Sequence, residues 1–150
     1  MATLPVVGDM TQHALIRSMM KSEKTPFPML DGREIALAVF GGPPPDDAYP
    51  KPVSEAVDRF FRLGASDRAN ATKKLVAYCN DFCDALGVPR LPLGSPDDIW
   101  KHVTEISALI ESFEDDPVEV RLACEISIDE EHGVVLVYRD GHQLSKVEQG

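Results

Sequence analysis

A regular alternation of apolar and polar residues between Val118 and Asp129 constrains the fold of this chain more than any other feature. A period of two is typical of a β-strand with one buried face and one solvent-facing face. The apolar positions are Val118, Val120, Leu122, Cys124, Ile126 and Ile128. The sequence therefore predicts a long strand that lies in a sheet and covers a hydrophobic core.

Two more strands are expected after this one. Turn-forming residues 129–133 interrupt the apolar pattern, and the β-branched run Val134–Tyr138 follows them as a second strand. The pair Asp140-Gly141 tolerates the positive φ angles of a type I′ turn, so a third strand over His142–Val147 should fold back on the second. This two-residue turn predicts the cross-strand pairs Arg139 with His142 and Val137 with Leu144.

The N-terminal half contains a similar pattern. Phe27–Leu30, the pair Asp31-Gly32 and Arg33–Phe40 predict another hairpin. Pro26 and Pro28 have no amide hydrogen to donate to a ladder. The first strand of this hairpin should therefore be short and lie at a sheet edge.

Two amphipathic helices are predicted after the proline-rich connection of residues 41–52. The first should end at Gly64 in a left-handed conformation, and the second should run from an N-cap at Ser66 to a stop at Gly87. Residues that recur at three- and four-residue steps define the apolar faces. They are Val53, Ala56, Val57 and Phe60 in the first helix, and Leu75, Tyr78, Cys79, Phe82 and Leu86 in the second.

Three shorter segments complete the prediction. Met10–Met20 is interpreted as a short helix. Ser95 followed by Pro96 has the pattern of a helix start, so a third, short helix is expected there. Its buried side should comprise Ile99, Trp100 and Val103. A further strand is expected between Thr104 and Phe113.

These elements predict a single α+β domain over residues 1–150, a length that can bury a hydrophobic core without disulfide or metal links. We expect an antiparallel sheet made from the N-terminal hairpin and the C-terminal meander. Two or three helices should pack on one face of that sheet.

The charge of the chain limits its partners. A formal net charge of −10 repels phosphates, so nucleic acid is not expected as a partner. No apolar run approaches the roughly 20 residues of a membrane helix, and the first residues lack a secretory signal pattern. We expect a cytoplasmic protein that binds neither nucleic acid nor membranes. The sequence indicates no particular oligomeric state.

Acidic residues gather in the segment around the long strand. The set that we interpret as a binding face is Glu114, Asp115, Asp116, Glu119, Glu125, Glu130 and Glu131. Such a surface attracts a basic protein, and neutralisation of a toxin, as by an immunity protein, is the most concrete form of this hypothesis. The alternative is a housekeeping or structural module in which the same acids only keep the domain soluble.

The residues that could support chemistry are few. Cys79 and Cys83 lie four residues apart on a predicted helix, but no second ligand pair accompanies them, so packing is preferred over metal binding. Glu131 and His132 share a loop and could form a general acid-base pair in a small hydrolase. No nucleophile stands near them in the sequence. We expect no metal, no cofactor and no catalytic residue, and a non-catalytic function is preferred.

Several short motifs resemble an uncharacterised bacterial family, a domain of unknown function. They are Asp97-Asp98-Ile99-Trp100, the strand Val118–Cys124, the segment Glu131–Gly141 with its Glu-His-Gly start, and the turn Pro28–Gly32. The chain departs from the family pattern at Ile128, where an aromatic residue is usual, and after its last strand, where Asp-Gly-His usually follows. The resemblance implies an α+β fold and a bacterial source, and it implies no activity.

Overall fold

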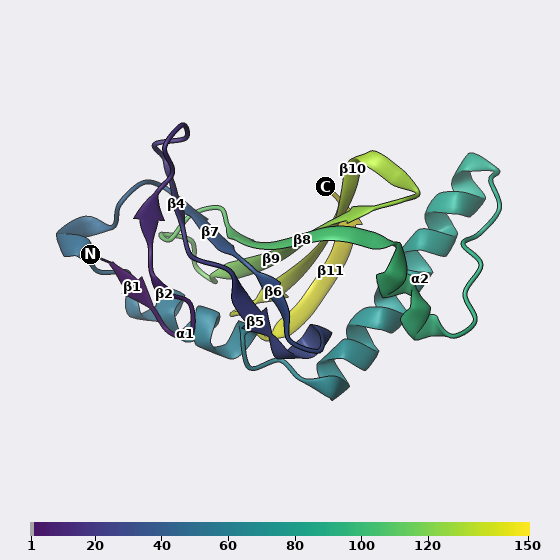
Figure 1. Ribbon diagram of the computed structural model, residues 1–150, viewed down its shortest axis with the longest axis horizontal. Coiled ribbons are helices and arrows are strands. Elements are labelled where there is room, and N and C mark those ends of the chain that lie inside the picture. The colour runs from purple at the N-terminus through teal and green to yellow at the C-terminus, as the bar shows by residue number, and fades with distance from the viewer. Residues whose placement is uncertain (1) are drawn as a thin grey trace.

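A seven-stranded mixed sheet forms the centre of the structure, a computed structural model that describes residues 2–150 (Figure 1). The strand order is β11-β10-β9-β8-β7-β4-β3. Every neighbouring pair is antiparallel except β7 and β8, which run parallel. Together with the helices, this sheet confirms the predicted α+β fold.

The C-terminal half of the sheet agrees closely with the sequence pattern. Its strands are β8 (Val103–Ile110), β9 (Glu119–Ile126), β10 (Asp129–Arg139) and β11 (Gln143–Gln149). In β9 the even-numbered residues from Val120 to Ile126 are buried, whereas the odd-numbered residues are partly or fully exposed. The predicted facing of the long strand is therefore confirmed.

The turn after β10 differs from the prediction in its register. Asp140 and Gly141 have positive φ angles of 53° and 79°, as expected for this pair. The turn nevertheless uses three residues, and a bulge leaves Ser145 outside the ladder, where its hydroxyl donates a hydrogen bond of 3.1 Å to the carbonyl of Val137. The predicted pairs are therefore wrong. The observed pairs are Arg139 with Gln143, Tyr138 with Leu144, and Val137 with Lys146.

A hairpin forms where one was predicted, but as a ribbon separate from the main sheet and with different strands. Most of Phe27–Leu30, predicted as the first strand, is a 3₁₀ turn, and the second predicted strand, Arg33–Phe40, is divided in two. Its strands are β5 (Thr25–Phe27) and β6 (Arg33–Ile35), joined by a 3₁₀ turn, η1 (Pro28–Leu30). The short strand with Pro26 is an edge strand, as expected. After β6 the chain continues as β7 (Leu37–Phe40), which enters the main sheet beside β8.

The helix predicted for Met10–Met20 is wrong, because this segment forms strands. β3 (Thr11–Gln12) and β4 (Met19–Lys21) pair as a hairpin, and β4 also pairs with β7. Met20 is buried, while Leu15 in the intervening loop is 88% exposed, which suits a hairpin tip. A second small ribbon, β1 (Thr3–Leu4) with β2 (Gly8–Asp9), precedes it.

The two α-helices occur where they were predicted. Figure 1 shows α1 (Lys51–Phe60) and the start of α2 (Ala65–Leu86) below the sheet in that view. All four apolar residues predicted for the face of α1 are buried. A 3₁₀ turn, η2 (Pro45–Asp47), precedes α1, and η3 (Pro96–His102) is the third predicted helix, also of 3₁₀ type, with Ile99 and Trp100 buried. Within residues 2–150 no helix has the length and apolar character needed to cross a membrane.

The helix ends correct two predictions. Gly64, with a φ of −127°, is the N-cap of α2, and its amide donates to the Asp67 carboxylate at 2.9 Å. Gly64 therefore does not end α1, and Ser66, the predicted N-cap, lies inside α2. Gly87 ends α2 in the left-handed region with a φ of 68°, as predicted. Leu86 is 61% exposed because the last turn of α2 extends past the core.

The three cysteines are buried, free thiols. Burial raises the pKa of both Cys79 and Cys124 to about 12, from an ordinary value of 9.0. We therefore expect the native protein to react very slowly with a thiol reagent such as DTNB at neutral pH, and to react at all three sites in urea. Rapid reaction of the native protein would contradict this burial.

The same thiols predict a loss of stability at alkaline pH. Their raised pKa means that the unfolded chain loses these protons above about pH 9, whereas the folded chain keeps them to about pH 12. The stabilisation from the buried thiols is complete below the pKa of the unfolded chain, about 9, and it falls as pH rises from about 9 to about 12. Thermal unfolding between pH 8 and 11 should show the loss, and Cys79→Ala with Cys124→Ala should reduce its slope.

Candidate functional site

The candidate site lies on the face of the sheet that carries the odd-numbered residues of β9, which we call the open face. Arg121 lies at its centre, with its side chain 17% exposed and surrounded by carboxylates. Its Nη1 donates to Glu148 Oε1 at 3.0 Å, and its Nε and Nη2 each lie 3.5 Å from a further glutamate. Those two residues are Glu111 and Glu119.

A cavity of about 570 Å³ opens on this face next to Arg121. Its apolar floor includes Leu109, Ala123 and Val135, and carboxylates of Glu105, Glu111 and Glu125 line it as well. Ile106 of β8 pairs with Cys124 of β9, so the adjoining residues Glu105 and Glu125 come together at a strand irregularity. Like charges on neighbouring strands repel each other, which makes this end of the cavity attractive to a cation.

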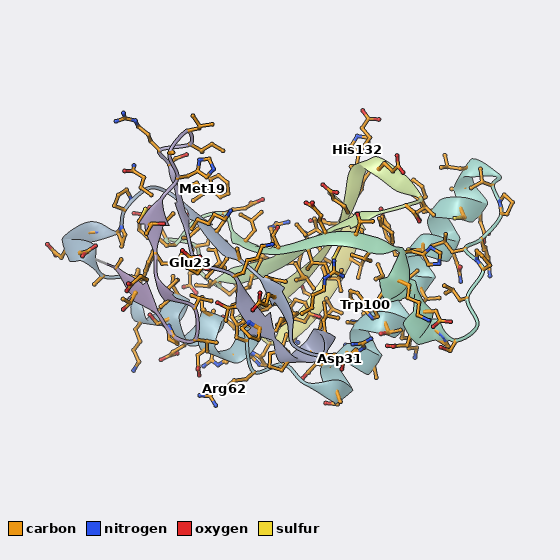
Figure 2. All side chains as sticks on the ribbon, viewed as in Figure 1. Met19, Glu23, Asp31, Arg62, Trp100 and His132 are labelled. Atoms are coloured by element: carbon orange, nitrogen blue, oxygen red, sulfur yellow. The ribbon has the colours of Figure 1, made fainter. Side chains whose placement is uncertain are left out.

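His132 lies at the rim of the same cavity, and its carboxylate partner is Asp129. The imidazole Nδ1 and the backbone amide of His132 lie 3.3 Å and 3.2 Å from Asp129 Oδ1. Gln149 of β11 donates to the other oxygen of Asp129 at 2.8 Å. His132 lies in the first part of β10, and Figure 2 shows it raised above the sheet in that view. The predicted pairing of His132 with Glu131 is thus replaced by a contact with Asp129.

Two carboxylates, Glu148 beside Arg121 and Asp129 beside His132, predict how the stability of the protein changes in acid. The hydrogen bond from Arg121 lowers the pKa of Glu148, and the hydrogen bond from Gln149 lowers the pKa of Asp129. The unfolded chain therefore binds more protons than the folded chain in acid. The stabilisation is complete above about pH 5 and is lost as pH falls through the lowered pKa values. Thermal unfolding between pH 2 and 6 should show this loss, and Glu148→Gln with Asp129→Asn should weaken it. An unchanged acid slope in that double variant would contradict the assignment.

Comparison with known proteins identifies the family of the chain. The family model described as "Domain of unknown function (DUF6985)" matches residues 6–149. The chain belongs to this family. No curated protein and no solved structure matches it at a significant level. The match agrees with the resemblance to an uncharacterised domain family.

In this member of the DUF6985 family the predicted acidic residues divide into three groups. Glu119 and Glu125 lie on the open face, Glu119 beside Arg121 and Glu125 in the cavity. The second group lies in the loop between β8 and β9, at one end of β9, and the third lies on the β9–β10 hairpin at the other end. These are Glu114, Asp115 and Asp116 in the loop, and Glu130 and Glu131 on the hairpin.

The structure also brings residues to the site that the sequence did not indicate. Glu105 lies in β8, Glu111 directly follows β8, and Glu148 lies in β11. They reach Arg121 or the cavity only because β8 lies beside β9 and β11 lies beside β10. Among residues 2–150 no group of three metal-ligating side chains comes together. Cys79 and Cys83 lie in the core side of α2, away from the cavity lining.

Proposed function

We propose that this protein is a non-catalytic binding protein whose open face holds a positively charged segment of a partner protein. The observation that supports this proposal is the pair of exposed carboxylates, Glu105 and Glu125, at one end of the cavity. Neither makes an ion pair among residues 2–150, whereas the nearby Glu111 faces Arg121. A lysine or arginine side chain placed between them would relieve their mutual repulsion and cover the apolar floor with its stem.

The net charge of the chain supports the same partner class. At −10 it draws basic proteins toward the surface over a distance of about one Debye length, roughly 8 Å at physiological salt. A basic toxin neutralised in a bacterial cytoplasm is the most specific form of this proposal. The resemblance of the sequence motifs implies the bacterial source. A small acidic protein is suited to bind a basic toxin because their charges are opposite.

Charge reversal at the cavity tests the proposal. Glu105→Lys with Glu125→Lys should abolish capture of the partner when the tagged protein is purified from its native host and bound proteins are identified by mass spectrometry. Asp9→Lys with Asp81→Lys changes the net charge equally at exposed residues of β2 and α2 and serves as the matched control. We expect the control to keep the partner.

The association rate of the captured partner gives a second measurement. It should decrease with added salt, and reversal at the cavity should slow association far more than the control reversal does. Equal rates for the two double variants would mean that the acids act only through net charge. If both double variants still capture the partner, the result would favour a housekeeping module in which the acidic residues only keep the protein soluble.

The hydrolase alternative is supported by a different observation, the contact of His132 with Asp129 at the cavity rim. A carboxylate that orients an imidazole is the arrangement of a general base. In this alternative, turnover of a bound substrate should disappear in His132→Gln and Asp129→Asn, while Glu131→Gln keeps it. If capture of the partner survives His132→Gln unchanged, the binding function does not need this pair.

A further inference from the structure

Among residues 2–150, the most exposed large apolar side chain lies on the loop between β3 and β4, residues 13–18, which we call the apolar tip. Leu15 is 88% exposed and the neighbouring Ile16 is 45% exposed. Figure 2 shows this loop extending away from the sheet beyond Met19. Leu15 and Ile16 thus place two adjacent aliphatic side chains in water at the end of a hairpin.

Hydrogen bonds within the loop and from residues beside it order the apolar tip. His13 Nδ1 accepts from the amides of Leu15 and Ile16 at 3.1 Å and 3.0 Å. Gln12 donates to the carbonyl of Arg17 at 2.7 Å, and the amides of Gly41 and Gly42 both donate to Ser18 at 2.9 Å. A loop ordered before binding loses less conformational entropy when it docks.

The charge around the apolar tip is opposite in sign to the net charge of the whole chain. Residues 10–24 contain Arg17, Lys21 and Lys24 but only one acid, Glu23, in a protein of net charge −10. None of these three cations makes an ion pair among residues 2–150. The open-face cavity has the complementary set, an apolar floor beside two unpaired carboxylates.

The positions of the two surfaces allow them to meet across a two-fold axis. In Figure 2 Met19, beside the apolar tip, and His132, at the cavity rim, stand on the same side of the sheet at opposite ends. Because the two surfaces lie toward opposite ends of that side, a second copy turned by 180° about an axis between them would face the first copy with an apolar tip opposite a cavity at both contacts. Such an isologous arrangement closes on itself and gives a dimer.

We propose that the protein self-associates in this way, with the apolar tip of each copy seated in the open-face cavity of the other. Leu15 and Ile16 would cover the apolar floor, and Arg17 would approach Glu105 and Glu125. The proposal rests on the binding role given to the open face, and it adds that a second copy of the chain competes with the basic partner for that face. The like net charge of the two copies keeps the association weak.

Sedimentation velocity from roughly 10 μM to 1 mM tests the proposal. The wild type should pass from monomer to dimer in this range. Leu15→Ser with Ile16→Ser, which changes only exposed side chains, should remain monomeric, as should Glu105→Lys with Glu125→Lys. The Asp9→Lys and Asp81→Lys control should still dimerise. A monomer throughout the range, or a dimer that survives the change at the apolar tip, would overturn the proposal.

Chemical cross-linking tests the predicted contact directly. Leu15→Cys combined with Ser107→Cys, a cavity residue, should give covalent dimers with a short bismaleimide, and neither single variant should. The native cysteines are buried and should not compete. A dimer that forms without this cross-link would contradict the docking geometry. Failure of self-association is distinguishable from failure of the binding function, because the Leu15→Ser, Ile16→Ser variant leaves the open face intact for capture of the basic partner.

Discussion

Gly141→Ala is expected to destabilise the protein by at least about 3 kcal/mol, measured by urea denaturation. Gly141 has a φ of 79°, a conformation that alanine adopts only with strain. A Cβ built at this position overlaps the carbonyl oxygen of Ala56 in α1. Relief of that overlap requires the β10–β11 turn and α1 to separate, which disrupts the core between them.

Gly32→Ala is the matched control for this effect. Gly32 has nearly the same φ, 77°, and nothing lies within 4 Å of a Cβ built on it. Gly32→Ala should therefore lower the free energy of unfolding only by the backbone strain, about 1–2 kcal/mol. The difference between the two variants therefore measures the contact between the turn and α1. Equal losses in the two variants would show that strain alone accounts for the effect.

Leu122→Ala is expected to cost about 2–5 kcal/mol, because it opens a cavity in the core beneath the central strand β9. Leu122 is fully buried and pairs with Leu136 of β10 and Ala108 of β8, so no neighbour can easily fill the space. Chemical denaturation at constant m-value would report the change.

Glu125→Ala, three residues further along β9, is the control for Leu122→Ala. Its side chain lies on the open face and makes no ion pair among residues 2–150, so its removal should change stability by no more than about 0.5 kcal/mol. Glu119 is less suitable, because it contacts Arg121. Similar costs for Leu122→Ala and Glu125→Ala would contradict the assigned facing of β9.

The sequence predicted those elements whose pattern is local. The period of two in β9, the buried face of α1 and the left-handed stop at Gly87 all depend on residues within a few positions of each other. The predictions for Gly64 and Ser66 were wrong because the short link between α1 and α2 holds two candidate caps, and the Asp67 carboxylate selects Gly64.

The sheet order depended on pairings that no local pattern specifies. Leu37 of β7 pairs with Ala108 of β8, and the periodicity of neither strand indicates the other as its partner. The candidate site was missed in part for the same reason. Glu119 and Glu125 could be placed on the solvent face from their odd positions, whereas Glu105 joins them only through the register of β8 with β9.

The parallel pairing of β7 with β8 has a consequence for the newly synthesised chain. Residues 41–102, which contain both α-helices, separate the two strands, so β7 has no partner on that edge until residue 110 has been made. The interval from Val39 to its partner Ile110 corresponds to roughly 4–14 s of translation. During this time the ribosome-bound N-terminal half exposes the apolar side chains of Leu37 and Val39 and an open strand edge. We expect nascent chains that stop before Val103 to depend on chaperones or to aggregate, and chains that extend through β11, which completes the sheet, to do neither.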